Sequence, residues 1–366
     1  MRCHLIYSVP KYGPKICRIP RKVRENLQLL GLPISAIGSR TQVRTDGWPN
    51  WAPATITKNL YEALRVRMPT LLYHLRERVP CDLDADDIVV GHPVFPYKPG
   101  TIGVTELTME GRPRPRLFAL ITPLHCNTDV QTSHINRDFL YAVDRLVPKA
   151  DLLFAIQGQY WWDRWDTSPF AHWKPKMVRL DMAVDVKFFP RVKKRFNPPG
   201  KRGYLYIGRN DPVKGISLLR ALREELSTFP WGWIGGGPEI PGIHRIARWR
   251  ELTSQFMREM AQRYDFFVNT SVADANPTTI LESMAWGFPV LCTLQSGYYE
   301  TSYIKNIYAD DVRRSTDVLT RLQHAEEDEL MQIADKARSA VEKEYNWKRF
   351  TDTVLGTIDR ALSEKT

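Results

Sequence analysis

Cysteine and long hydrophobic runs are both scarce in this 366-residue sequence. No apolar run approaches ~18 residues, so no segment is predicted to span a membrane, and the first ten residues are too short to form a signal peptide. The cysteines are odd in number and include no Cys-x-x-C pair, which favours reduced thiols in a cytoplasmic protein over a disulfide framework or a zinc site. They are Cys3, Cys17, Cys81, Cys126 and Cys292.

Acidic residues are fewer than basic ones. The chain has 41 Asp and Glu against 52 Lys and Arg, a net charge of +11. This excess suggests a polyanionic partner, or peripheral contact with an anionic surface such as the inner face of a membrane. The sequence also has no low-complexity segment and no internal repeat, so its length predicts two or three ordinary globular domains.

The most informative stretch begins at Asp265. Residues 265–271 are an apolar run that ends in small polar residues, a pattern typical of a buried parallel strand leaving its sheet. Asn276 is a good N-cap and Pro277 suits the first helical position, so a short helix should run from there to about Trp286. Two free N–H groups at its start would favour a phosphate. These groups belong to Thr278 and Thr279.

Two carboxylates accompany this predicted helix. Asp274 lies in the loop just before it, and Glu282 lies one to two turns into it. One short segment therefore offers a phosphate-binding end and two groups suited to sugar or ribose hydroxyls. The alternative is an ordinary strand, turn and helix with surface acids.

A second stretch has a related pattern. Residues 204–207 predict a strand and residues 216–226 a helix, with a tight turn between them. Arg209 and Lys214 lie on either side of that turn, where a forked donor and a point charge could reach one diphosphate. Taken alone, the two cations could equally be solvated surface charges.

Together, the two stretches resemble the C-terminal half of a GT-B glycosyltransferase of family 4. That family has a Gly-Arg…Lys-Gly turn, two acids separated by seven residues, and an Ala-x-Gly-x-Pro-Val segment. All of these occur here in order and spacing, with a Gly-Gly-Gly-Pro turn as well. The matching positions are Gly208-Arg209, Lys214-Gly215, Asp274 with Glu282, 285–290 and 235–238. The resemblance covers residues 177–350 well and the first half loosely.

This resemblance implies an α/β fold in which two doubly wound, Rossmann-like domains face each other across a cleft. Residues 1–185 would form the acceptor-binding domain, and residues 186–345 would form the nucleotide-sugar-binding domain. The C-terminal helix, residues 346–366, would pack back onto the first domain.

The implied activity is transfer of a sugar, with retention of anomeric configuration, from a nucleotide-diphospho-sugar such as a UDP- or GDP-sugar. No metal and no other cofactor are expected, because the basic turn can supply positive charge to the leaving diphosphate. The implied catalytic residues are Asp274, His125, Arg209 and Lys214. The implied donor-binding residues are Gly208, Arg209, Lys214, Gly236, Asp274, Pro277, Thr278, Thr279 and Glu282. Among these, Glu282 would hold the ribose. Asp274, which replaces the commoner Glu, would hold a sugar hydroxyl.

Two histidines follow predicted strands of the first half. His92 comes after the apolar run 87–91, and His125 comes after the run 116–124. Ligands of open α/β sheets bind at such strand ends. In related enzymes a histidine here contacts the donor sugar or lies near the acceptor, so we assign His125 to catalysis and His92 to the acceptor. Otherwise both are loop histidines.

The loop after the first predicted strand departs from the family pattern. It has one glycine, Gly13, where related enzymes usually have two. Lys11, Tyr12 and Lys15 are the expected acceptor-binding residues here, and a basic run continues to Arg24. This run either contacts an anionic membrane or nucleic acid, or is a solvated helix face.

The acceptor is left open by the sequence. We expect a polysaccharide or lipid-linked acceptor. DNA with hydroxymethylated bases, as modified by phage glycosyltransferases, also suits the charge of +11. A non-catalytic sugar-nucleotide or nucleic-acid binding module is the third reading, although it would have no need of Arg209, Lys214, Asp274 and Glu282 together.

Three further segments complete the sequence. The aromatic residues of 160–165 could form core, stack on a sugar or base, or lie at a lipid interface. The acids of 82–86 contain the string Asp-x-Asp, but they precede a strand, so we interpret them as a charged loop. Residues 191–202, rich in charge, proline and glycine, predict the linker between the domains.

Overall fold

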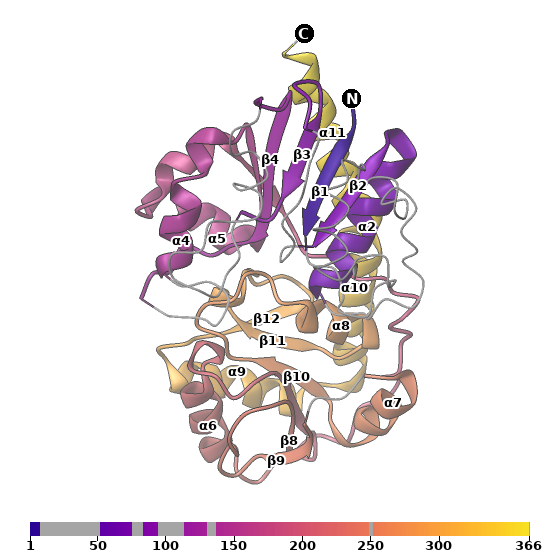
Figure 1. Ribbon diagram of the computed structural model, residues 1–366. Helices are drawn as coiled ribbons and strands as arrows, with labels where there is room; N and C mark the ends of the chain where they lie inside the picture. Colours follow the sequence, from indigo (N-terminus) through magenta and orange to yellow (C-terminus); the bar gives the residue numbers. More distant parts are fainter. Residues whose placement is uncertain (8–51, 75–82, 94–112, 130–136, 249–251, 366) are drawn as a thin grey trace, which may run out of the picture.

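The computed structural model consists of two α/β domains, one beyond the other, each built on a parallel sheet (Figure 1). It describes residues 1–7, 52–74, 83–93, 113–129, 137–248 and 252–365. The predicted basic helix and the acceptor residues Lys11, Tyr12 and Lys15 lie outside the described residues. Among the described residues, no helix is both long and apolar enough to cross a membrane.

The first sheet has the strand order β2-β1-β3-β4-β5-β6, and every pairing is parallel. Its central strands are apolar on both faces, as expected for strands covered by helices on both sides. The direction of winding reverses between β1 and β3. The strands are β1 (Cys3–Tyr7), β2 (Thr70–His74), β3 (Ile88–Gly91), β4 (Leu117–Pro123), β5 (Leu152–Ile156) and β6 (Met177–Leu180).

The second sheet has the order β12-β11-β10-β7-β8-β9, again entirely parallel. This is the order of a dinucleotide-binding Rossmann sheet, and its winding reverses between β7 and β10. Ligands of such sheets bind beyond the carboxyl ends of the strands at that point. The strands are β7 (Tyr204–Ile207), β8 (Trp231–Ile234), β9 (His244–Ala247), β10 (Phe266–Asn269), β11 (Val290–Thr293) and β12 (Ile304–Ile307).

Helices cover both faces of each sheet. In the second domain, α6 and α9 pack into one core of the sheet and α7 and α8 into the other, while α10 contributes side chains to both. The α-helices are α2 (Ala52–Arg67), α4 (Arg137–Asp144), α5 (Gly158–Arg164), α6 (Ile216–Glu225), α7 (Ser254–Arg263), α8 (Thr278–Trp286), α9 (Val312–His324), α10 (Glu327–Lys343) and α11 (Trp347–Ser363). Short 3-10 helices are η3 (Val147–Lys149), η4 (Trp165–Thr167), η5 (Ala171–Lys176), η6 (Pro212–Lys214) and η7 (Leu294–Ser296).

Helix α11 follows the second sheet in sequence but packs on the first. Its start is fixed by Asn346, whose side chain accepts a hydrogen bond from the Arg349 N–H at 2.9 Å. It then runs beside α2 and β4, and Arg67 of α2 forms an ion pair with Asp359. One hydrophobic core therefore continues from the first sheet through α11 into the second domain.

The predicted fold class, two doubly wound parallel-sheet domains, is confirmed. The domain boundary between residues 185 and 186 stays a prediction, although β6 ends at Leu180 and β7 begins at Tyr204. The predicted linker, 191–202, has no helix or strand, but it is not a solvated tether. Two of its cations, Lys193 and Arg202, are 1% exposed because they hydrogen-bond to the second domain.

Candidate active site

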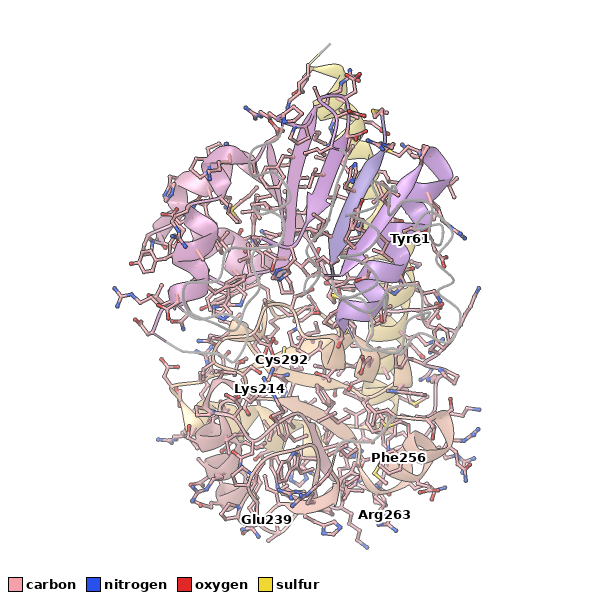
Figure 2. All side chains as sticks on the ribbon, viewed as in Figure 1. Tyr61, Lys214, Glu239, Phe256, Arg263 and Cys292 are labelled. Atoms are coloured by element: carbon pink, nitrogen blue, oxygen red, sulfur yellow. The ribbon has the colours of Figure 1, made fainter. Side chains whose placement is uncertain are left out.

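An ion pair between Lys214 and Asp274 lies beyond the carboxyl ends of the second sheet. Lys214 belongs to the turn η6 after β7, and Asp274 to the loop after β10, so both lie at the point where the winding reverses. Figure 2 shows Lys214 in the part of the second domain that faces the first. The side chains are 20% and 17% exposed, so an entering ligand can reach them.

Glycine fixes the turn that carries Lys214. Gly215 has a φ of 62°, in the left-handed region that favours glycine. A Cβ at this position would lie 1.8 Å from the carbonyl oxygen of Thr270. The Thr270 hydroxyl donates to the Lys214 carbonyl oxygen at 2.8 Å. The turn therefore presses directly against the end of β10, which fixes Lys214 relative to the Asp274 loop.

His125 approaches this pair from the first domain. It follows β4, is 1% exposed, and neither ring nitrogen makes a well-formed hydrogen bond in the described part of the chain, although the Asn127 backbone lies close enough to interact with the ring. Burial lowers the pKa of His125 to about 4, although the nearby Asp274 carboxylate opposes this and Lys214 adds to it. The imidazole is therefore neutral at pH 7, and its unpaired nitrogens mark a polar site lacking internal partners.

A residue that the sequence analysis did not single out, Trp161, joins these groups. Its indole N–H donates to the carbonyl oxygens of Asp274 at 2.8 Å and Gln295 at 3.2 Å. Its ring lies 5.5 Å from the His125 ring, centroid to centroid. The only sequence signal was its place in the aromatic cluster directly after β5. Of the three interpretations of that cluster, core packing holds for Trp165, which is fully buried.

The start of α8 differs from the prediction by one residue. The helix begins at Thr278 with Pro277, not Asn276, as its N-cap. Asn276 instead has a φ of 64°, and its side-chain oxygen accepts a hydrogen bond from the N–H of Met182. This contact across the two domains holds Asn276 away from the capping position. The free N–H groups predicted for the first turn, on Thr278 and Thr279, have no acceptor among the described residues.

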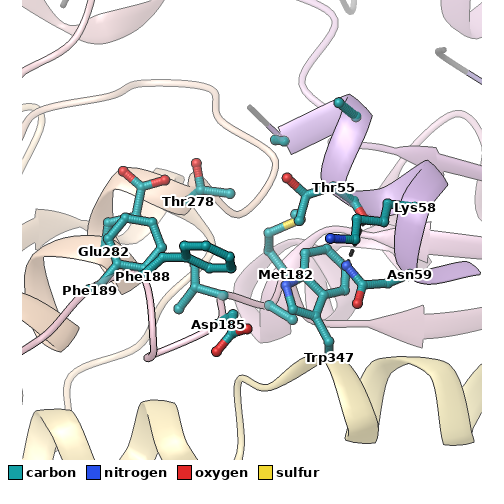
Figure 3. A pocket seen from close by; sticks show the side chains of 14 residues that line it. Thr55, Lys58, Asn59, Met182, Asp185, Phe188, Phe189, Thr278, Glu282 and Trp347 are labelled. Carbon is teal, nitrogen blue, oxygen red and sulfur yellow. Dashed lines mark hydrogen bonds between the residues drawn. The ribbon is translucent and has the colours of Figure 1, made fainter. Parts of the chain in front are cut away.

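Glu282 lies one turn further along α8 and lines a pocket between the two domains (Figure 3). Thr278 lies beside it, while Lys58 and Asn59 of α2 and Trp347 of α11 form the opposite wall. Burial raises the pKa of Glu282 to about 7, and a hydrogen bond with the Thr278 hydroxyl opposes this rise. A carboxyl group of this kind changes its charge near neutral pH.

The glycine turns after β7 and β8 meet one another. A Cβ on Gly235 would lie 1.8 Å from the Gly208 carbonyl oxygen, so only glycine permits this approach. The Asn210 N–H donates to the Gly236 carbonyl oxygen at 2.8 Å. Arg209, between these contacts, is 31% exposed, and among the described residues its guanidinium has just one ion pair, a long one with Asp211 at 3.8 Å. Its guanidinium can therefore turn toward a ligand at small cost.

His92 has a different setting from His125. It follows β3, and its Nε2 lies 3.0 Å from the Thr122 hydroxyl within the first domain. The predicted charged loop also lies away from the Lys214–Asp274 pair. Asp84 and Asp86 precede β3, so they lie at the amino ends of the strands of the first sheet, whereas His125 lies at the carboxyl ends. Within the described ranges, no three His, Cys, Asp or Glu side chains come together as a metal site.

The geometry thus brings three kinds of group to the region between the two domains, with Lys214, Asp274 and His125 close together and Glu282 in the pocket beside Thr278. Cations and free N–H groups can bind phosphate, carboxylates can accept from hydroxyls, and a neutral buried imidazole faces them from the other domain. These groups come from segments as far apart in sequence as His125 and Glu282. Such convergence at strand ends indicates a ligand site rather than scattered surface charge.

Comparison with known proteins gives a consistent picture of the fold. The chain matches no protein-family model. It is 24% identical over 259 residues to "Putative colanic acid biosynthesis glycosyltransferase WcaL" of Escherichia coli K12. That match covers 64% of this chain but only 62% of the relative, less than two thirds of its length.

Solved structures resemble the whole chain. Sucrose-phosphate synthase from Thermosynechococcus elongatus covers 100% of both chains with a TM-score of 0.59 and 12% identity. The E. coli trehalose-6-phosphate structure bound with UDP-2-fluoro glucose covers 99% of both with a TM-score of 0.58 and 12% identity. TarM has a TM-score of 0.56 at 10% identity, and 56% of its own length is covered. At such low identity these likenesses establish the fold, which is the two-domain GT-B arrangement of glycosyltransferases.

Proposed function

We propose that this protein is a retaining glycosyltransferase, similar to family 4, that transfers a sugar from a nucleotide-diphospho-sugar to an acceptor hydroxyl. The observation that carries this proposal is the meeting of His125 with the Lys214–Asp274 pair between the two sheets. The relative WcaL, named as a glycosyltransferase, and the neighbour with bound UDP-2-fluoro glucose support it. The second domain, residues 186–345, would bind the donor and the first, residues 1–185, the acceptor.

The donor diphosphate would lie between the β7 turn and the start of α8. Arg209 and Lys214 supply positive charge, and the N–H groups of Thr278 and Thr279 supply donors along the helix dipole. Gly208 and Gly236 would allow the backbone to approach the donor. Since Asp274 is paired with Lys214 in the free protein, the diphosphate competes with Asp274 for this lysine. Donor binding then releases the Asp274 carboxylate toward a sugar hydroxyl.

The catalytic demand is to stabilise a departing diphosphate while the anomeric carbon becomes cation-like. Arg209 and Lys214 meet the first part electrostatically, without a metal. His125 would contact the transferred sugar as a neutral imidazole, since its pKa is lowered to about 4. Glu282 would hold the two ribose hydroxyls, which suits a carboxylate at the side of the phosphate-binding helix end.

We propose a polysaccharide or lipid-linked acceptor. WcaL is named for the biosynthesis of colanic acid, and the net charge of +11 favours an anionic acceptor or membrane surface. Lys11, Tyr12, Lys15 and His92 are the proposed acceptor contacts, the first three from outside the described residues. The protein would act in the cytoplasm or on the inner face of the membrane.

A screen of nucleotide sugars by thermal shift tests this function. We expect stabilisation by one UDP- or GDP-sugar and by its nucleoside diphosphate, rising with the logarithm of ligand concentration above the Kd. Incubation of that donor with anionic polysaccharides, lipid-linked saccharides and hydroxymethylated DNA then identifies the acceptor, and NMR of the product gives its anomeric configuration. Loss of binding in Lys214→Ala locates the donor. No stabilisation by any nucleotide sugar, or a product with inverted configuration, would contradict the proposal.

A further inference from the structure

Helix α5 of the first domain hydrogen-bonds to the loop of the second domain that carries Asp274. Figure 1 shows α5 at the edge of the first domain that faces the second. Trp161 is 3% exposed, and its indole N–H bonds to the carbonyl oxygens of both Asp274 and Gln295. These two segments are themselves joined, because the Asp274 N–H donates to the Gln295 carbonyl oxygen at 3.0 Å. One indole thus holds the turn and the loop together.

The backbone beside Trp161 approaches the second domain just as closely. The Tyr160 N–H donates to the Gly297 carbonyl oxygen at 3.3 Å. Gly158 has a φ of 71°, and a Cβ there would lie 2.4 Å from that same oxygen and 2.8 Å from the Asn276 side-chain nitrogen. We call Gly158, Tyr160 and Trp161, with their contacts, the α5 clasp. Only glycine allows the two backbones to come this near.

We infer that Trp161 is a positioning residue that sets the register between His125 of the first domain and Asp274 of the second. It packs against the His125 ring at 5.5 Å and bonds to the Asp274 carbonyl oxygen, so it touches both halves of the proposed sugar site. This inference rests on the proposed function. It adds that the alignment of the two halves depends on the clasp and not only on the covalent connection between domains.

If Trp161 positions the two halves of the site, its loss should affect kcat and not the affinity for nucleoside diphosphate. A tryptophan with a purely structural role would affect both. Donor diphosphate binding depends on Arg209, Lys214 and the α8 N–H groups, all in the second domain. The chemical step needs His125 and Asp274 in register, and a misplacement of about 1 Å can cost ~100-fold in rate. Loosening the clasp should therefore lower kcat while leaving the affinity for nucleoside diphosphate nearly unchanged.

Trp161→Phe in the full chain tests this inference. It keeps an aromatic ring near His125 and removes the N–H together with part of the indole's volume, a loss of volume that the control variant shares. We expect kcat to fall by about 10-fold or more, with the Kd for nucleoside diphosphate changed by less than about 3-fold. Trp165→Phe is the matched control, because its buried indole donates to the Phe170 carbonyl oxygen, 2.9 Å away within the first domain. The control should lower Tm but leave kcat unchanged. Unchanged kcat in Trp161→Phe, or an equal loss in both variants, would overturn the inference.

A second pair of variants opens the clasp sterically. Gly158→Ala places a methyl group against the Gly297 carbonyl oxygen, whereas Gly200→Ala has a similar φ of 75° and no atom within 4 Å. Both carry the same backbone strain, so a fall in kcat limited to Gly158→Ala supports the clasp. An equal kcat in the two variants contradicts it.

One readout is independent of catalysis and so distinguishes this inference from the proposed function. Hydrogen exchange at the Tyr160 and Met182 amides reports the bonds between the domains. It should be faster in Trp161→Phe than in Trp165→Phe even if no nucleotide sugar is ever turned over. Equal exchange in the two variants would overturn the clasp, while a protein that binds no nucleotide sugar would overturn the proposed function alone.

Discussion

Two Lys–Asp ion pairs lie at opposite ends of strand β10 and differ in burial and in hydrogen bonding. Lys193 and Asp265 meet just before the strand, where they are 1% and 0% exposed. Lys214 and Asp274 meet beyond its other end, and their side chains are 20% and 17% exposed. The residue types are the same, so the difference between the pairs comes from their surroundings.

The first pair has every bonding position filled. Lys193 donates to Asp265 at 2.7 Å and to the carbonyl oxygens of Ala261 and Tyr264. Asp265 also accepts from the N–H groups of Asn197 and Gly203. Burial lowers the pKa of Lys193, and Asp265 opposes that change. Such saturation leaves no capacity for a ligand and holds the 191–202 segment to the sheet.

The second pair has few other bonds. Besides Lys214, the only described residue that hydrogen-bonds to the Asp274 carboxylate is Ser271, whose hydroxyl donates weakly at 3.4 Å. The remaining acceptor positions of this carboxylate have no partner within the described ranges, and its charge reaches the nearby His125. An ion pair whose partners keep unused bonding capacity can exchange one partner for a ligand, which a saturated pair cannot do. Under the proposed function, this unused capacity is what would let the Lys214–Asp274 pair bind a ligand.

The largest effect is expected from Asp265→Ala. Removing one partner of a buried pair leaves the Lys193 charge without compensation, so the free energy of unfolding should fall by about 3–5 kcal/mol. Denaturant titration measures this loss, and the turnover per folded molecule should be near normal. A loss below about 1 kcal/mol would mean that the pair is not structural.

Lys214→Ala should give the reverse pattern. We expect turnover to fall by about 100-fold, the scale for one electrostatic contact to the transition state, while the unfolding free energy changes by about 1 kcal/mol or less. Arg209→Ala should behave similarly, and the exposed Lys336→Ala is the control. Wild-type turnover in Lys214→Ala would remove the functional half of the comparison.

A third carboxyl group, that of Glu282, should make both the stability of the protein and its affinity for the donor depend on pH. Its pKa is raised from 4.5 to about 7 in the folded protein, so its contribution to stability is present below about pH 4.5 and lost as the pH rises through 7. Donor affinity should change in the opposite sense, because the ionised carboxylate accepts from ribose hydroxyls. Titrations with nucleoside diphosphate between about pH 5.5 and about pH 8 should show a lower Kd at the higher pH. The same titrations of Glu282→Gln should show a smaller dependence, because the ionisation of the diphosphate itself remains while that of Glu282 is removed.

The smallest effect is expected from chelation. If Arg209 and Lys214 neutralise the diphosphate, excess chelator should leave the rate of sugar transfer unchanged. The assay compares chelated enzyme with enzyme given manganese or magnesium. An absolute requirement for added metal would mean that the lysine pair is not the main source of charge for the leaving group.

The second domain was predictable because its strands and turns are local features. The apolar run before Asn269 and the glycines at 208 and 215 indicate a strand and a tight turn without reference to the rest of the chain. The helix after Pro277 was found for the same reason. The spacing of Asp274 and Glu282 is also local, since both belong to one loop and helix.

Contacts between domains were not predictable in this way. Asn276 has the sequence signature of an N-cap, but the Met182 N–H from the other domain takes its side-chain oxygen. Lys193 resembles a solvated linker cation, yet a carboxylate 72 residues later in the sequence buries it. Trp161 could not be distinguished from core tryptophans, because its acceptors lie more than a hundred residues away. Local propensity contains no information on such partners.

Helix α11 has a consequence for the order in which the protein can fold. The first sheet is translated early, but the helix that covers it, Trp347–Ser363, is translated only after the whole second sheet. At about 5–20 residues per second, the interval from the end of β6 is on the order of ten seconds. During that interval the second domain can already close its core, while the apolar surface beneath α11 stays open. The domain that is synthesised first is therefore the one completed last, and its nascent form is the stage at which chaperones would be needed.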